Sequence, residues 1–212
     1  MKQARILSLV LCLLILLATV AWAANGNKAA SPSGEAASGE AVSAEMPETA
    51  TEWILSAFSC KSFTDEAVSD ELVEQILNAG IQSPSAINTQ PCKFILVNNK
   101  DIASQLISAP VVVVIAVPVE NYCPGGNSQF AAGVAAEAMY LYAQAAGLGA
   151  HMYTAPVSMS INASPEMQAD LGLPEGYEAA VVLGFGHYED YADAVSGAST
   201  RNAYDSFVSV IE

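Results

Sequence analysis

The stretch FAAGVAAEAMYLYAQAA, at residues 130–146, decides how the rest of this chain folds. Its apolar residues cover nearly the whole circumference of an α-helix, and Gly147 supplies an end. A helix that is apolar all round is buried on every side. We therefore expect it to be the central helix of the domain or part of a subunit interface. Glu137 is the acid within it, and a buried carboxylate needs a partner. A backbone amide or Tyr hydroxyl as that partner is favoured over a role as catalytic acid.

Short runs of β-branched residues surround this helix. They predict buried strands at 94–97, 111–117, 150–153 and 179–185. Because strands and helices do not alternate strictly, the pattern favours an α+β fold over a doubly wound parallel sheet.

Three further helices are predicted from their ends. Ser69 caps the first, whose apolar residues follow from Leu72, and Gly80 is expected to stop it. A brief helix fits residues 101–108. Ser164 and the proline after it begin another short helix, which stops at Gly172.

The N-terminus has the pattern of an export signal. Basic residues precede an apolar run at 6–20, and AWA at 21–23 provides a cleavage site. We therefore expect residues 1–23 to be a cleaved signal peptide and the protein to be extracytoplasmic, either periplasmic or secreted. The alternative is an uncleaved anchor that tethers the chain to the membrane, because about 20 apolar residues cross a bilayer.

Residues 24–52 are rich in Ala, Ser, Gly and Glu and contain few large apolar side chains. Such a segment cannot offset the entropy of ordering, so we predict a disordered linker. Residues 53–212 then form a single domain.

Charge and composition exclude some partners. The chain has 22 acidic and 7 basic residues, which gives a net charge of −15, and 52% of its residues are hydrophobic. This composition excludes a chain that is disordered throughout. Nucleic-acid binding requires clustered Lys and Arg, whereas the basic residues here are scattered singly, so we expect no nucleic-acid partner.

Several motifs are incomplete. The Gly-x-Gly pairs at 147–149 and 184–186 lack the third glycine of a dinucleotide loop, and GASTR at 197–201 lacks the last glycine of a nucleophile elbow. His151 and His187 have no Cys or second His at ligand spacing, so we predict no metal site. We interpret His151 as a hydrogen-bonded structural residue.

Signal removal would leave Cys60, Cys92 and Cys123, an odd number. Three single disulfides are then open, and the sequence does not choose among them. A reactive thiol is the less favoured interpretation, since no adjacent His or helix N-terminus is evident to lower a thiol pKa.

Two segments resemble the motifs of one family. FSCKSF at 58–63 is followed five residues later by Val68, and QSPSAINTQP occupies 82–91. They resemble the nitroreductase family of FMN-dependent oxidoreductases, whose motifs read R-S-x-R-x-F-x-x-x-x-V and P-S-x-x-N-x-Q-P-W. The resemblance continues through GLG at 147–149 and LGLPEGY at 171–177. It implies an α+β fold with helices flanking a central, mostly antiparallel sheet, and a homodimer with flavin at the subunit interface.

The resemblance also implies which residues hold the flavin phosphate. By motif position they are Ser59, Lys61 and a basic residue near the C-terminus, Arg201. Phe58 stands where the family has its first arginine, and Lys61 replaces the second, which loses bidentate recognition of phosphate.

Ring and ribityl contacts are implied for Ser85, Asn88 and Gln90 in the second motif, where Cys92 replaces the family tryptophan. The stretch at Thr154 matches the place where the family directs a backbone N–H at the flavin N5.

The activity implied is hydride transfer through FMN to an electron-poor acceptor, nitro- or quinone-like, with NAD(P)H as one donor. The cofactor supplies the chemistry, so no side chain is predicted to be catalytic. The alternative is a non-catalytic flavin-binding or interaction module of the same fold.

Overall fold

The computed structural model describes residues 54–120, 127–196 and 207–211. The predicted signal peptide and linker, together with Cys12, Cys123 and Arg201, lie outside the described residues. Among the helices described, none is both long and apolar enough to cross a membrane.

Four strands form one sheet in this part of the chain. They are β1 (Lys93–Leu96), β2 (Val111–Pro118), β3 (Gly149–Tyr153) and β4 (Tyr177–Gly186). Their order across the sheet is β1-β2-β4-β3, and each neighbouring pair is antiparallel. The predicted strands are therefore confirmed to within two residues at each end, and so is the α+β fold.

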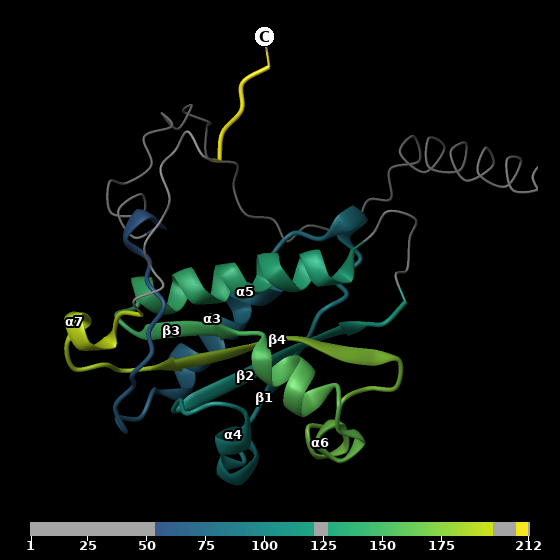
Figure 1. Cartoon of the computed structure of the whole chain (residues 1–212), viewed down its shortest axis with the longest axis horizontal. Helices are drawn as coiled ribbons and strands as arrows, with labels where there is room; N and C mark the ends of the chain where they lie inside the picture. Colours follow the sequence, from purple (N-terminus) through teal and green to yellow (C-terminus); the bar gives the residue numbers. More distant parts are fainter. Residues whose placement is uncertain (1–53, 121–126, 197–206, 212) are drawn as a thin grey trace, which may run out of the picture. The chain divides into compact units, whose positions relative to one another are not determined.

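Helices cover both faces of this sheet (Figure 1). One face packs against α3 (Asp70–Ile81) and α5 (Ser128–Ala145), and the other against α4 (Lys100–Leu106), α6 (Pro165–Asp170) and the π-helical turn η2 (Val157–Ile161). Two shorter pieces, η1 (Ala86–Asn88) and α7 (Tyr191–Ala194), precede β1 and follow β4. The predicted caps are confirmed: Leu72 N–H donates to Ser69 Oγ at 3.3 Å, and Met167 N–H donates to Ser164 Oγ at 3.2 Å.

The β-branched run of β2 supplies both halves of the core. Val113 and Ile115 point towards α3 and α5, whereas Val112 and Val114 point towards α4 and α6. Successive side chains on a strand face opposite ways, so a strand covered on both sides is apolar at every position.

Within one chain only one side of α5 is buried, so the helix is not enclosed by its own domain, and the alternative of a subunit interface stays a prediction. Ala132, Ala136 and Met139 pack against the sheet, with exposed fractions of 1%, 1% and 0%. On the opposite side Phe130 is 72% exposed and Glu137 is exposed as well. Within one chain Glu137 therefore has no buried partner, contrary to the expectation, because its carboxylate is exposed.

Gly80 does not stop α3, contrary to the prediction. The helix continues to Ile81, and Gly80 is buried against α5. A Cβ at this position would lie 2.7 Å from Met139 Sδ and 2.9 Å from Phe94 Cε1. The glycine is therefore required by the close approach of two helices and not by a turn, which sequence spacing could not distinguish.

We predict that Gly80→Ala lowers the free energy of unfolding by about 1–3 kcal/mol, the usual cost of overpacking, although Ala has the higher helix propensity. Chemical denaturation measures the change. In a Met139→Ala background the same substitution should cost at least about 1 kcal/mol less, because the truncated side chain makes room. Equal costs in the two backgrounds would show that the contact with Met139 is not what requires glycine.

Candidate functional site

The opening motif extends the sheet beyond β3. Ser59 forms a parallel bridge with Ala150, and Cys60 N–H donates to Ala150 O at 2.9 Å. On its other side, Cys60 forms an antiparallel bridge with Val195, and Ser196 N–H donates to Ser59 O at 2.9 Å. The structure thus brings the opening motif beside the chain that leads towards Arg201, five residues after Ser196. The role of Arg201 itself stays a prediction.

Phe58 belongs to the core and not to a ligand site. It is 7% exposed and packs edge-on against Tyr188 and Tyr191, with ring centroids 5.4 and 4.7 Å away. Gln144 of α5 makes two hydrogen bonds with the Phe58 backbone. Phe58 N–H donates to Gln144 Oε1 at 3.0 Å, and Gln144 Nε2 donates to Phe58 O at 3.2 Å. These contacts fix the position of the opening motif on α5.

His151 is a structural residue, as predicted. Its Nδ1 lies 2.8 Å from Cys60 O and its ring stacks on Tyr153, with centroids 4.0 Å apart. Since a carbonyl only accepts hydrogen bonds, Nδ1 must carry the proton.

Neither described cysteine is activated, and both Cys60 and Cys92 are free thiols. Burial raises the pKa of the Cys60 thiol, which donates to Ser62 O at 3.1 Å, and burial also raises the pKa of Cys92. Both thiols therefore stay protonated at neutral pH. Within the described residues, no group of three or more His, Cys, Asp or Glu side chains could hold a metal ion.

The loop that carries the second motif is strained. Among the described residues, the non-glycine positions with positive φ are Ile87 at 46°, Asn88 at 58° and Gln90 at 47°. Left-handed backbone costs roughly 1–2 kcal/mol for an ordinary L-residue, and for a β-branched one such as Ile87 it is a clear outlier. Backbone strain of this kind clusters at functional sites, where surrounding contacts maintain it.

Ser85 maintains the strained conformation. Its carbonyl accepts from Asn88 N–H at 3.0 Å, and its side-chain Oγ accepts from Gln90 N–H at 2.9 Å. The hydroxyl still has its own O–H to donate to a ligand. Asn88 and Gln90 are exposed, so their side-chain amides are accessible. The sequence indicated these residues but not the structural role of Ser85.

The predicted residues form two separate sets within one chain. The strained loop runs into β1, whose first residue, Lys93, pairs with Ala116 of β2. Ser59 is in register with Val111 of β2, through the pairings of β3 and β4 that lie between them. Along the strands these two positions of β2 are five residues apart, or about 17 Å. Across the sheet, four strand spacings of about 4.8 Å separate β1 from the opening motif. The two sets are therefore roughly 25 Å apart. Thr154 follows β3 at the loop's end of the sheet and is exposed.

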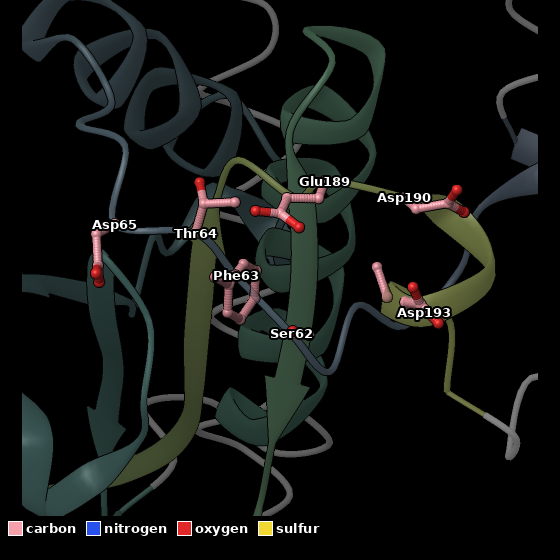
Figure 2. Close-up of a pocket in the computed structure, with 8 residues that line it drawn as sticks. Ser62, Phe63, Thr64, Asp65, Glu189, Asp190 and Asp193 are labelled. Carbon is pink, nitrogen blue, oxygen red and sulfur yellow. The ribbon is translucent and has the colours of Figure 1, made fainter.

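An acidic cavity of about 340 Å³ lies beside the opening motif (Figure 2). It is lined by Ser62, Phe63, Thr64, Asp65, Glu189, Asp190, Asp193 and Ala194. Four of these side chains are carboxylates, and Lys61 is the one lysine or arginine in the neighbouring described segments 54–69 and 187–196. This cluster is not visible in the sequence, because its two halves are more than 120 residues apart in the chain.

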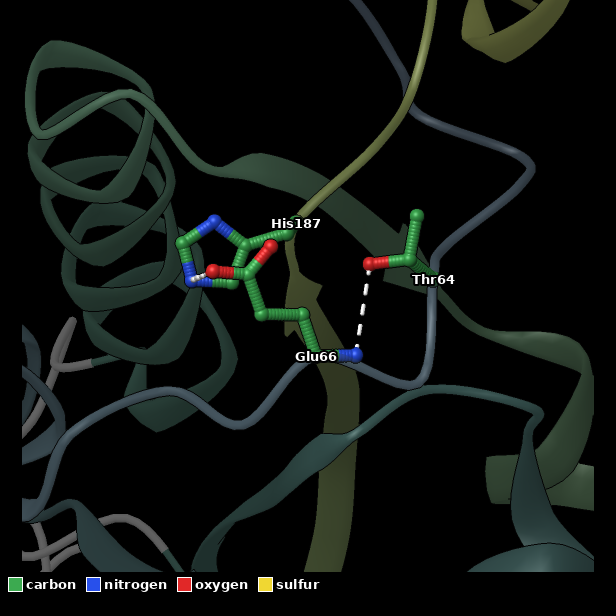
Figure 3. Close-up of polar contacts among 3 residues, drawn as sticks. All are labelled: Thr64, Glu66 and His187. Carbon is green, nitrogen blue, oxygen red and sulfur yellow. Dashed lines mark hydrogen bonds and ion pairs between the residues drawn. The ribbon is translucent and has the colours of Figure 1, made fainter.

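Backbone hydrogen bonds join the two halves of this cavity, and Figure 3 shows the side-chain contacts of Thr64, Glu66 and His187 beside them. Thr64 N–H donates to His187 O at 2.8 Å, and Glu66 N–H donates to Thr64 Oγ1 at 3.4 Å. A side-chain pair between His187 Nε2 and Glu66 Oε1 spans 4.0 Å, and the Glu66 side chain is 70% exposed. Solvent screens such a pair, so the backbone bonds position the segment.

Comparisons with known proteins agree with this fold. Residues 54–122 match a model of the nitroreductase family. A relative from Archaeoglobus fulgidus, named as an NADH dehydrogenase/NAD(P)H nitroreductase, is 27% identical over 158 residues, which is 69% of this chain and 89% of that protein.

Solved structures give the same result. A nitroreductase from Desulfovibrio desulfuricans in complex with FMN is 27% identical, with a TM-score of 0.65 over 77% of this chain and 96% of that one. A nitroreductase with bound FMN from Desulfitobacterium hafniense is 22% identical, with a TM-score of 0.63 over 79% of this chain and 100% of that one.

We predict that Ile87→Gly raises the free energy of unfolding by about 1 kcal/mol, because glycine adopts positive φ without strain and the lost side chain is 84% exposed. Val119→Gly is the matched control, an exposed β-branched residue with negative φ, and it should destabilise by up to about 1 kcal/mol. Denaturant titration of both variants checks this. A loss of stability in Ile87→Gly equal to that in the control would mean that the loop is unstrained in solution.

Proposed function

We propose that this chain, which has the nitroreductase fold and resembles that family in sequence, is an FMN-dependent oxidoreductase. The observation that carries the proposal is the strained loop at 85–90, where the three described non-glycine residues with positive φ all fall within the family's second motif. The structures of relatives with bound FMN support the choice of cofactor. Left-handed backbone at exposed polar residues is what a preorganised binding loop requires.

The groups of this loop fit the polar edge of a flavin ring. Asn88 and Gln90 offer amide donors and acceptors, and Ser85 offers a hydroxyl proton. Ser59 and Lys61, with Arg201, are the residues proposed for the phosphate end. When bound, FMN would take hydride from a donor and pass it to an acceptor. The chain's own residues would bind and orient the ring and hold the loop rigid.

We propose further that each site is shared between two copies of the chain. Ser59 and the strained loop are roughly 25 Å apart in one chain. The short side chains of Ser and Asn cannot reach towards one common flavin over that distance. Among the described elements, no helix packs over the face of α5 that carries Phe130, Val134 and Glu137, and the apolar residues of this face suit a symmetric contact. A homodimer across this face is the arrangement that we propose.

The proposed electron donor is NADH or NADPH, which the names of relatives support. The proposed acceptor is a small electron-poor molecule of the nitro or quinone class. The export pattern of residues 1–23 motivates an extracytoplasmic location, and the linker at 24–52 would then separate the domain from the membrane or form a tail.

Anaerobic mixing tests the activity. Flavin-loaded protein should lose its visible flavin absorbance on addition of NADH or NADPH and regain it on addition of benzoquinone. A protein that binds FMN but is reduced by neither nucleotide would instead be the non-catalytic flavin-binding module.

For the loop, we predict that Asn88→Asp weakens FMN binding about tenfold. Asp also tolerates left-handed backbone, so the variant keeps the conformation but replaces amide donors with a charge, and a lost hydrogen bond costs about 1 kcal/mol or more. Flavin fluorescence titration gives the affinity. Asn98→Asp, the same change at the far end of β1, should leave it unaltered. If both variants bind FMN as the wild type does, the loop does not contact flavin.

For the interface, Val134→Asp should produce a folded monomer with no measurable flavin binding, because a carboxylate would be buried in the proposed contact. Met159→Asp, an exposed apolar residue on the opposite helical layer, should stay dimeric and bind flavin. Sedimentation and far-UV circular dichroism check the assembly and the folding. A Val134→Asp dimer that retains flavin would place the interface elsewhere.

A further inference from the structure

We propose that the 5′-phosphate adds little to flavin binding in this chain, so that riboflavin is bound about as tightly as FMN. This inference rests on the proposed function, with flavin held between the strained loop of one copy and the opening motif of another. It concerns which flavin the site accepts, and it follows from the charges and hydrogen bonds around the opening motif.

The first reason is charge. Lys61 is followed directly by Ser62, which lines the acidic cavity with Asp65, Glu189, Asp190 and Asp193. These four carboxylates line one cavity of about 340 Å³, so their charges add to one local negative potential at ordinary salt concentration. Lys61 and the proposed Arg201 supply two positive charges, against the four carboxylates that line the cavity. A phosphate dianion gains little net attraction in such surroundings.

The second reason is that three backbone donors in and directly after the opening motif are already used. Cys60 N–H donates to Ala150 O at 2.9 Å, Lys61 N–H to Ala194 O at 2.8 Å and Thr64 N–H to His187 O at 2.8 Å. Anion sites in proteins are commonly built from free backbone N–H groups in a loop or at a helix start. These three N–H groups bond protein carbonyls, so they cannot compensate for the missing cations.

The helix start nearest the cavity is also occupied. Ala192 N–H in the first turn of α7 donates to Asp190 Oδ1 at 2.7 Å, so a protein carboxylate already occupies the place that an anion would take. Phe58, where the family has an arginine, is buried against Tyr188 and Tyr191 and cannot present a charge. The side chains available to the ligand thus favour the ring and the ribityl chain over the phosphate.

The test is a pair of titrations on the full-length, flavin-free protein, followed by flavin fluorescence. We expect dissociation constants for riboflavin and FMN that agree within about threefold, equivalent to less than 1 kcal/mol. FMN binding that is 30-fold tighter or more would overturn the inference and leave the proposed function intact. Failure of both flavins to bind would instead overturn the proposed function, so the two outcomes are distinct.

Neutralising the cavity provides a second, independent measurement. The double variant Asp190→Asn, Asp193→Asn keeps a side chain able to cap α7, and it should tighten FMN binding about three- to tenfold while leaving riboflavin unchanged. Glu71→Gln, Glu74→Gln on the exposed side of α3 is the matched control for net charge and should change neither affinity. An FMN affinity that does not respond to the first variant, or a riboflavin affinity that rises equally, would show that the carboxylates do not act on the phosphate.

Discussion

The contact between the alanine face of α5 and the antiparallel sheet is the constraint on which the rest of the structure depends. Small side chains such as Ala132 and Ala136 let the helix lie close to the strands, and this closeness forces glycine at position 80 of α3. At its C-terminal end the same helix holds the opening motif through Gln144. The packing of α5 on the sheet thus positions α3, the strand pairings beyond β3 and the opening motif, which is proposed to bind the flavin.

Local elements were predictable where the signal is local. The strands were found because a strand buried on both faces needs apolar residues at every position, as in β2, and the caps at Ser69 and Ser164 act within three residues of themselves. Errors arose where the answer depends on a distant partner. The sequence alone predicts that Gly80 ends a helix, because it does not show that Met139 lies against this glycine. It predicts that Glu137 is buried, because it does not show that the sheet covers only the other side of α5.

The candidate site shows the same division. Linear motifs identified Ser85, Asn88 and Gln90, but not the positive φ angles that strain them or the hydroxyl that keeps the loop folded. They identified Lys61, but not the carboxylates of 189–193 that β4 and α7 bring beside it. Chemistry that arises from two segments over a hundred residues apart is invisible in either segment alone. The separation of the loop from the opening motif is likewise a property of strand order, which no motif encodes.

The central claim is that two copies of the chain build each flavin site, and subunit mixing tests it most directly. One variant, Asn88→Asp, damages the loop, and another, Lys61→Glu, makes the opening end repel a phosphate. Each alone should bind FMN poorly. When the two variants are unfolded together and refolded, half of the dimers are mixed. In each mixed dimer one site combines the two intact parts and the other combines the two damaged ones. About a quarter of the wild-type FMN capacity should therefore return. Recovery of no capacity in a mixture shown to contain mixed dimers would contradict the account, because it would mean that each site lies within a single chain.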